Sequence, residues 1–238
     1  MFSITDEKEQ AIFDKFRTKM AELEQDDYIL IRFLRARNHD LDKAEEMLRK
    51  SVEWRRAKNI SEFLQWKPSS PKFEDHSPFV CTGLDKEGSA VIYAPFGRWD
   101  TRHKLEQGLR EDCYNYTYYM LENIMYHIRN SKNGKMTFIA DQAGLSYWNV
   151  AHVETGQVFF AAFKTFEQNY PEILKVAYVI NAPWLFQAVF KFLRPVFTGN
   201  TLSKINIFNG DKGKYVAEMR KLIPEESMPS ECIGMKKC

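Results

Sequence analysis

The sequence lacks any apolar run close to the length of about 20 residues that a membrane-spanning helix needs. Residues 1–10 carry neither a basic stretch nor an apolar stretch, so no secretory signal is expected. The cysteines form no CxxC pair and have no histidine at zinc-ligand spacing; they are Cys81, Cys113, Cys232 and Cys238. We therefore expect a cytoplasmic protein with free thiols, whose contact with membranes is peripheral.

Signatures of catalysis are also missing. The motifs GxSxG, GxGxxG, GxxxxGK[ST] and HExxH do not occur, and the five histidines lie in unrelated contexts. Asp141 ends a predicted strand, where active-site acids are common, but no partner base accompanies it. We interpret Asp141 as a turn residue that accepts hydrogen bonds from local backbone N–H groups. The sequence thus predicts a protein that is not an enzyme and holds neither a metal ion nor a cofactor.

The charge balance argues against nucleic acid as a partner. With 34 basic and 32 acidic residues the net charge is +2, whereas nucleic-acid-binding proteins usually carry a much larger basic excess. A local basic patch facing an anionic membrane or lipid headgroup remains compatible with this balance. The aromatic residues are 18 Phe, 11 Tyr and 5 Trp, which fits either an aromatic-rich core or an apolar cavity lined with rings.

The pattern of apolar residues divides the chain in two. Helical spacing predicts helices over 6–23 and 27–36, and a third that begins at the N-cap Asp40 and ends near Asn59. After a connector at 67–71, strands expected at 90–94, 136–140, 176–180 and 204–208 alternate with helices expected at 109–129, 152–168 and 185–193. This alternation predicts an α/β fold with a mostly parallel or mixed sheet. We place an N-terminal helical module at 1–66 and a second domain at 67–238.

The predicted helix at 185–193 is apolar around nearly its whole circumference. Gln187 and Lys191 are its polar residues, and a helix of this kind must be buried or face lipid. Two interpretations are open: a core helix, or a movable lid over an apolar cavity. Pro183, Pro195 and Gly199 flank the helix and could act as hinges for a lid.

Several motifs together resemble one family. They are Phe33-Leu34-Arg35-Ala36-Arg37 with Asp42-Lys43-Ala44 and Trp54-Arg55, the turn Asp141-Gln142-Ala143-Gly144-Leu145-Ser146, and Tyr170-Pro171-Glu172, Ile180-Asn181-Ala182-Pro183-Trp184 and Thr201-Leu202-Ser203-Lys204-Ile205. In order and spacing, over residues 5–235, they resemble the CRAL-TRIO lipid-binding proteins. The resemblance implies a CRAL-TRIO-N helical module, a mixed β-sheet floor, helices that enclose a lipid cavity, and a gating helix that includes Phe186, Val189, Phe190 and Leu193.

Within this family, the sequence resembles the yeast-type phosphatidylinositol/phosphatidylcholine transfer proteins. That resemblance implies a phosphatidylinositol headgroup site made of Arg37, Glu172, Thr201 and Lys204. Basic side chains would bind the phosphate through charge-assisted hydrogen bonds, and the carboxylate would accept hydrogen bonds from inositol hydroxyls. Simpler alternatives are open: Arg37 could cap the preceding helix, and Glu172 and Lys204 could form an ordinary ion pair.

The family's phosphatidylcholine site is not reproduced. Cys81, Ile92, Met136 and Phe138 stand where those relatives have the Tyr, Ser and Thr residues that bind the choline phosphate. These four side chains predict instead an apolar cavity wall. We therefore expect a second ligand that is more hydrophobic than phosphatidylcholine, such as a sterol or a polyisoprenoid.

The resemblance implies a carrier that exchanges phosphatidylinositol with this second ligand at membrane surfaces. One alternative is a lipid sensor or scaffold that regulates phosphoinositide signalling, with an inositol-lipid kinase as its partner. Another is a carrier of a different hydrophobic ligand, haem included.

Overall fold

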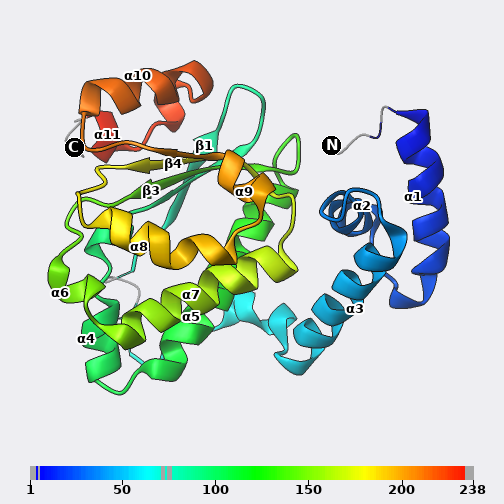
Figure 1. Ribbon diagram of the computed structural model, residues 1–238, viewed down its shortest axis with the longest axis horizontal. Coiled ribbons are helices and arrows are strands. Elements are labelled where there is room, and N and C mark those ends of the chain that lie inside the picture. Colours follow the sequence, from blue (N-terminus) through cyan, green and yellow to red (C-terminus); the bar gives the residue numbers. More distant parts are fainter. Residues whose placement is uncertain (1–3, 5, 71–72, 74–76, 234–238) are drawn as a thin grey trace.

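The N-terminal part of the computed structural model, which describes residues 4, 6–70, 73 and 77–233, is a set of three helices. They are α1 (Glu7–Lys19), α2 (Asp27–Arg35) and α3 (Leu41–Ala57), with short 3-10 turns at Ala21–Leu23 and Ile60–Gln65. Each α-helix starts after an aspartate whose carboxylate accepts a hydrogen bond from a backbone N–H of the first turn. Their apolar stripes pack together into a core of their own, separate from the rest of the chain. Figure 1 shows this module beside the larger part of the molecule.

The second part is built on a mixed five-stranded sheet in the order β1-β2-β3-β4-β5. β1 (Val80–Leu84) pairs antiparallel with β2 (Ala90–Ala94), and β3 (Met136–Asp141), β4 (Leu174–Ile180) and β5 (Ile205–Ile207) continue the sheet in parallel. The predicted α/β class and mixed sheet are confirmed. The sequence prediction missed β1, an edge strand with little apolar alternation and a bulge between Cys81 and Gly83.

Helices cover both faces of the sheet, as Figure 1 shows. On one face lie α4 (Thr101–Glu106), α5 (Arg110–Arg129), α6 (Tyr147–Val150), α7 (Val153–Asn169), α8 (Phe186–Leu193) and α9 (Gly199–Ser203), with 3-10 turns at Phe96–Arg98 and Arg194–Val196. On the other lie α10 (Lys212–Leu222), α11 (Ser230–Ile233) and a 3-10 turn at Glu225–Ser227. Alternate strand residues face the two layers: Ile92 packs in the α5 core, and Val91 and Tyr93 pack in the α10 core.

Two further findings concern the described part of the chain. None of its helices combines the length and the apolar character required to cross a bilayer. Nor does it contain a group of three or more His, Cys, Asp or Glu side chains placed to hold a metal ion.

Candidate functional site

A large cavity lies between the sheet and the helical layer formed by α5, α7 and α8. Its volume is about 620 Å³, within the range of about 300–1,000 Å³ that ligand pockets occupy. Most of the side chains that line it are apolar, and many are phenylalanines from α7 and α8, such as Phe159, Phe163 and Phe190. Of the two interpretations of the aromatic content, the structure therefore supports the cavity lined with rings.

Helix α8 forms part of the wall of this cavity. Phe186, Val189, Phe190 and Leu193, the residues expected on a gating helix, all line the cavity. The outer side of the α8 region is mixed: Phe192, which also lines the cavity, is 51% exposed, Trp184 just before the helix is 82% exposed, and the polar residues Gln187 and Lys191 are exposed beside them. Helix α8 thus lies between the cavity and solvent, with apolar side chains on its cavity side.

The four residues predicted for the cavity wall lie at different distances from it. Met136 and Phe138 on β3 line the cavity. Ile92 is fully buried on β2 and Cys81 is partly buried on β1, and neither is among the lining residues. The sheet order explains this difference, because Phe138 pairs with Ile92, and Ile92 pairs with Cys81, one and two strands farther from the cavity.

Three of the four predicted headgroup residues come together at the α9 end of the cavity. The Lys204 Nζ lies 3.4 Å from the Glu172 Oε2, and these side chains are 19% and 18% exposed. The Asn200 amide donates to the Glu172 Oε1 at 2.5 Å. Thr201 shares the short helix α9 with Asn200 and lines the cavity. Polar groups and apolar cavity thus meet at α9.

Arg37 lies on a different element, the connection between α2 and α3. Its guanidinium donates to the carbonyl oxygen of Ala36, the residue that caps α2, at 2.9 Å. The contacts that the simpler alternatives describe, a helix cap for Arg37 and an ion pair for Glu172 and Lys204, are therefore present in the structure.

The N-terminal module holds the segment that carries Glu172. Arg32 on α2 is buried, and its Nε donates to the carbonyl oxygen of Pro171 at 2.8 Å. Arg55 on α3 forms a two-pronged ion pair with Glu122 on α5, at 3.0 and 2.8 Å, and the Tyr170 hydroxyl donates to the same carboxylate at 2.7 Å. Sequence reasoning found Arg55 and Tyr170 only as family motifs, and missed Arg32 and Glu122.

Glu172 itself has an unusual backbone conformation. Its φ is +59°, in the left-handed region that residues with a side chain rarely adopt. Such a conformation persists only where the surroundings impose it, and it is frequent at functional sites. The anchored neighbours Tyr170 and Pro171 supply that constraint here.

A further cation near this end was missed by the sequence analysis. Lys135 precedes β3, whose first residue pairs with Leu174, so it lies beside the strand that follows Glu172. Burial, followed by the positive charge of Lys204, lowers the pKa of Lys135. Its ammonium group makes no hydrogen bond or ion pair with the residues that the structure describes. The sequence feature that could have identified Lys135 is its position directly before a buried strand.

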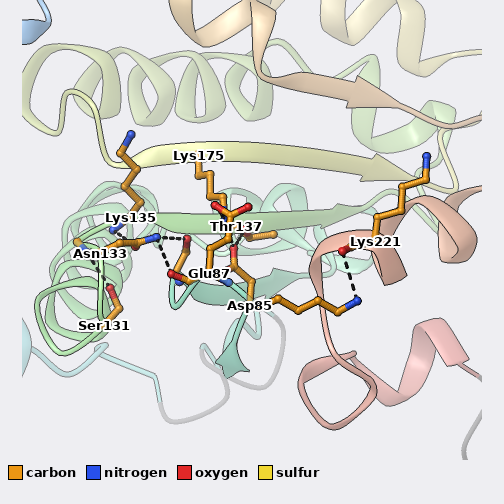
Figure 2. Close-up of polar contacts among 11 residues, drawn as sticks. Asp85, Glu87, Ser131, Asn133, Lys135, Thr137, Lys175 and Lys221 are labelled. Carbon is orange, nitrogen blue, oxygen red and sulfur yellow. Dashed lines mark hydrogen bonds and ion pairs between the residues drawn. The ribbon is translucent and has the colours of Figure 1, made fainter. Parts of the chain in front are cut away.

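The neighbouring lysine, Lys175, is occupied by contacts within the fold. Its Nζ lies 2.8 Å from the buried Asp85 carboxylate, which also accepts hydrogen bonds from Thr137 and from the backbone N–H groups of Glu87 and Ser89 (Figure 2). Burial raises the pKa of Asp85, but the hydrogen bonds from Lys175, Ser89 and Thr137 outweigh it and hold the pKa below its usual value. This network ties the β1–β2 turn to β3 and β4, whereas Lys204 pairs with Glu172 and the charge of Glu172 also acts on Lys135.

Asp141 has the role expected from sequence. One of its oxygens accepts from the backbone N–H of Ala143 at 2.9 Å and from the Asn181 amide at 2.8 Å, and the other accepts from the Tyr93 hydroxyl at 2.8 Å. The interpretation as a turn residue is confirmed.

Comparisons with known proteins agree with this architecture. Patellin-2 of Arabidopsis thaliana is 26% identical over 225 residues, which are 92% of this chain and 32% of that protein. A CRAL-TRIO domain-containing protein of Caenorhabditis elegans is 26% identical over 206 residues, 84% of this chain and 28% of that protein. This chain therefore spans about a third of the length of these curated relatives.

The fold and the family profiles lead to one assignment. The solved structure of Sfh5 matches with a TM-score of 0.68 and 16% identity, covering 87% of this chain and 82% of that one. Residues 74–234 match the family described as the CRAL/TRIO domain, and residues 3–50 match its N-terminal domain. With an apolar cavity and both family profiles in order, the chain belongs to the CRAL-TRIO family of lipid-binding proteins.

Proposed function

We propose that this protein carries phosphatidylinositol and exchanges it for a second, more hydrophobic ligand at membrane surfaces, as a cytoplasmic protein that catalyses no covalent step. The observation that carries the proposal is the position of α9. Thr201 on α9 lines the apolar cavity, and Lys204 directly after α9 is paired with Glu172. One short helix therefore joins a place for acyl chains to a place for a polar headgroup.

The cavity supplies the driving force for carrying a lipid. Removing acyl chains from water is favourable by about 0.8 kcal/mol per CH₂ group, so a lipid leaves a bilayer only for another apolar environment. The phenylalanines of α7 and α8 provide that environment. Movement of α8 would open it, and the exposed Trp184 and Phe192 would meet the membrane as it opens.

The polar cluster suits an inositol phosphate better than a simple anion. Lys204 and Lys135 can neutralise the phosphate, and Glu172 can accept hydrogen bonds from ring hydroxyls. When the lipid binds, Lys204 exchanges Glu172 for the phosphate, and Glu172 exchanges Lys204 for ring hydroxyls. Neither charge is then left unsatisfied. A ligand without hydroxyls would leave the partly buried Glu172 carboxylate with fewer partners, which favours inositol lipids.

The wall residues favour an apolar second ligand. Met136 and Phe138 face the cavity and offer no hydrogen-bond donor to a choline phosphate. We expect lipid extracted from the purified protein to contain phosphatidylinositol and little phosphatidylcholine. Native mass spectrometry that finds phosphatidylcholine as the main bound lipid would contradict the proposal.

The headgroup assignment is tested by transfer of labelled phosphatidylinositol between vesicles. Lys204→Ala and Glu172→Lys should each abolish transfer and leave the far-ultraviolet circular dichroism unchanged. Lys221→Ala is the matched control, because Lys221 is an exposed lysine paired with Glu218 on the far side of the sheet. Wild-type transfer rates in both site variants would refute the assignment.

A further inference from the structure

A buried lysine stands in the cavity wall, away from the headgroup cluster. Lys104 on α4 is only 4% exposed and lines the cavity. Its Nζ donates to the Ser77 hydroxyl and lies 3.9 Å from the centre of the Phe73 ring. Figure 1 shows α4, which carries Lys104, and α9, which is capped by Lys204, at opposite ends of the helical layer.

In the part of the chain that the structure describes, no close carboxylate balances the charge of Lys104. None of the ion pairs among the described residues includes Lys104, and Asp100 is the carboxylate whose negative charge reaches it at longer range. Burial lowers the pKa of Lys104 to about 8, so the side chain still carries its proton for most molecules at neutral pH. A buried, unpaired cation is costly, and proteins usually pair it or expose it.

The other groups around Lys104 limit the kind of ligand headgroup that can bind there. The rings of Trp99, Tyr116 and Phe73 contact one another in the same part of the wall, and Thr117 on α5, whose hydroxyl donates to the carbonyl oxygen of Cys113, also lines the cavity. The Tyr116 hydroxyl donates to the carbonyl oxygen of Ser77, so that group is already engaged. The Lys104 ammonium, together with the Ser77 hydroxyl beside it, can satisfy one carboxylate, whereas a larger headgroup with many hydrogen-bonding groups would lack partners.

We propose that Lys104 is the binding site for the carboxylate of a long-chain carboxylic acid, whose apolar tail occupies the cavity. This inference rests on the cavity being a ligand site, as in the proposed function, but not on phosphatidylinositol. It gives the second ligand a chemical class: an acidic, single-chain amphiphile of the fatty-acid type. Its headgroup lies near α4 and its tail occupies the space that the acyl chains of a phospholipid anchored at α9 would need. The two ligands therefore exclude each other, which is what exchange requires.

The test compares binding of oleic acid with binding of its methyl ester to the delipidated full chain. The two probes share their tail and differ in charge. The wild type should bind the acid at least about tenfold more tightly, as expected for a charge-assisted hydrogen bond in an apolar site. Lys104→Met should bind acid and ester alike, and Lys104→Arg should retain part of the preference for the acid.

Two further measurements keep the outcomes distinct. Thermal unfolding checks that Lys104→Met is folded, and the variant is expected to be at least as stable as the wild type, because it replaces a buried charge by an apolar side chain of similar size. Lys204→Ala should lose phosphatidylinositol transfer and keep its preference for the acid.

The results separate the two proposals. Equal binding of acid and ester by the wild type would overturn the role of Lys104, as would an unchanged preference in Lys104→Met; the lysine would then serve only to fix Ser77. If the preference is present but no phosphatidylinositol is transferred, the carboxylate site stands and the phosphatidylinositol proposal fails.

Discussion

The ion pair between Arg55 and Glu122 joins the N-terminal module to the lipid-binding part, and its removal should weaken the fold measurably. The Glu122 side chain is 10% exposed and the Arg55 side chain 35%. Breaking a fully buried pair costs about 3–5 kcal/mol, because one charge is left without its partner. Water reaches Arg55 in part, so we expect Arg55→Met to lower the free energy of unfolding by about 2–3 kcal/mol.

The assay is urea unfolding followed by circular dichroism, with a double-mutant cycle. Glu122→Met alone leaves Arg55 unpaired, and Arg55→Met with Glu122→Met leaves neither charge. The double variant should be more stable than the sum of the single effects predicts, with a coupling energy above about 1 kcal/mol. Arg220→Met is the matched control, since it breaks an exposed pair with Glu225 and should cost about 0–1 kcal/mol.

Two results would refute this reasoning. A loss no larger in Arg55→Met than in Arg220→Met would mean that the pair contributes nothing beyond an exposed one. Additive single effects would mean that the two side chains do not stabilise each other. Because the Tyr170 hydroxyl donates to the same carboxylate, we also expect slower phosphatidylinositol transfer in Arg55→Met, through loosening of the segment that carries Glu172.

Three other predictions follow from the structure. Lys135→Met should slow phosphatidylinositol transfer several-fold without loss of stability, whereas the exposed neighbour Lys132→Met should not; equal rates in both would remove Lys135 from the headgroup site. The hydrogen bond from Arg35 holds the pKa of Glu9 at about 2, against an ordinary 4.5. The stabilisation by Glu9 is therefore complete above pH 4.5 and is lost as the pH falls toward 2. In acid titrations, the difference in unfolding free energy between the wild type and Glu9→Gln should shrink over that interval. Trp184→Ser should leave the thermal midpoint within about 2 °C of the wild type and reduce vesicle transfer, and an unchanged transfer rate would exclude Trp184 from the membrane contact.

Elements with strong periodicity were predictable from sequence. The helix expected at 185–193 is observed as Phe186–Leu193, and the helix expected at 109–129 as Arg110–Arg129. Their apolar residues are close enough in sequence for local spacing to define them. Helix α10 was missed because most of its residues are polar; its apolar residues Tyr215, Val216 and Met219 pack against the far face of the sheet.

The site was only partly predictable for a different reason. Glu172 and Lys204 are 32 residues apart, and what brings them together is the parallel pairing of β4 and β5, which sequence spacing alone does not reveal. The family resemblance supplied them as a set. Lys104 gave no signal, because a lysine on a short charged helix usually points to solvent and its burial depends on segments far away in the chain. The domain boundary at residue 66 stays a prediction.

Under the proposed headgroup assignment, the left-handed backbone at Glu172 opposes stability to ligand selection at a single position. Glycine adopts a φ of +59° without steric cost, whereas glutamate holds it at an expense of about 1–3 kcal/mol. A Glu172→Gly change would therefore relax the chain while it deletes the carboxylate. Directed evolution of this protein for heat tolerance alone should favour glycine at position 172, and the resulting variant should be more stable but should lack the selection of inositol lipids that we propose for Glu172.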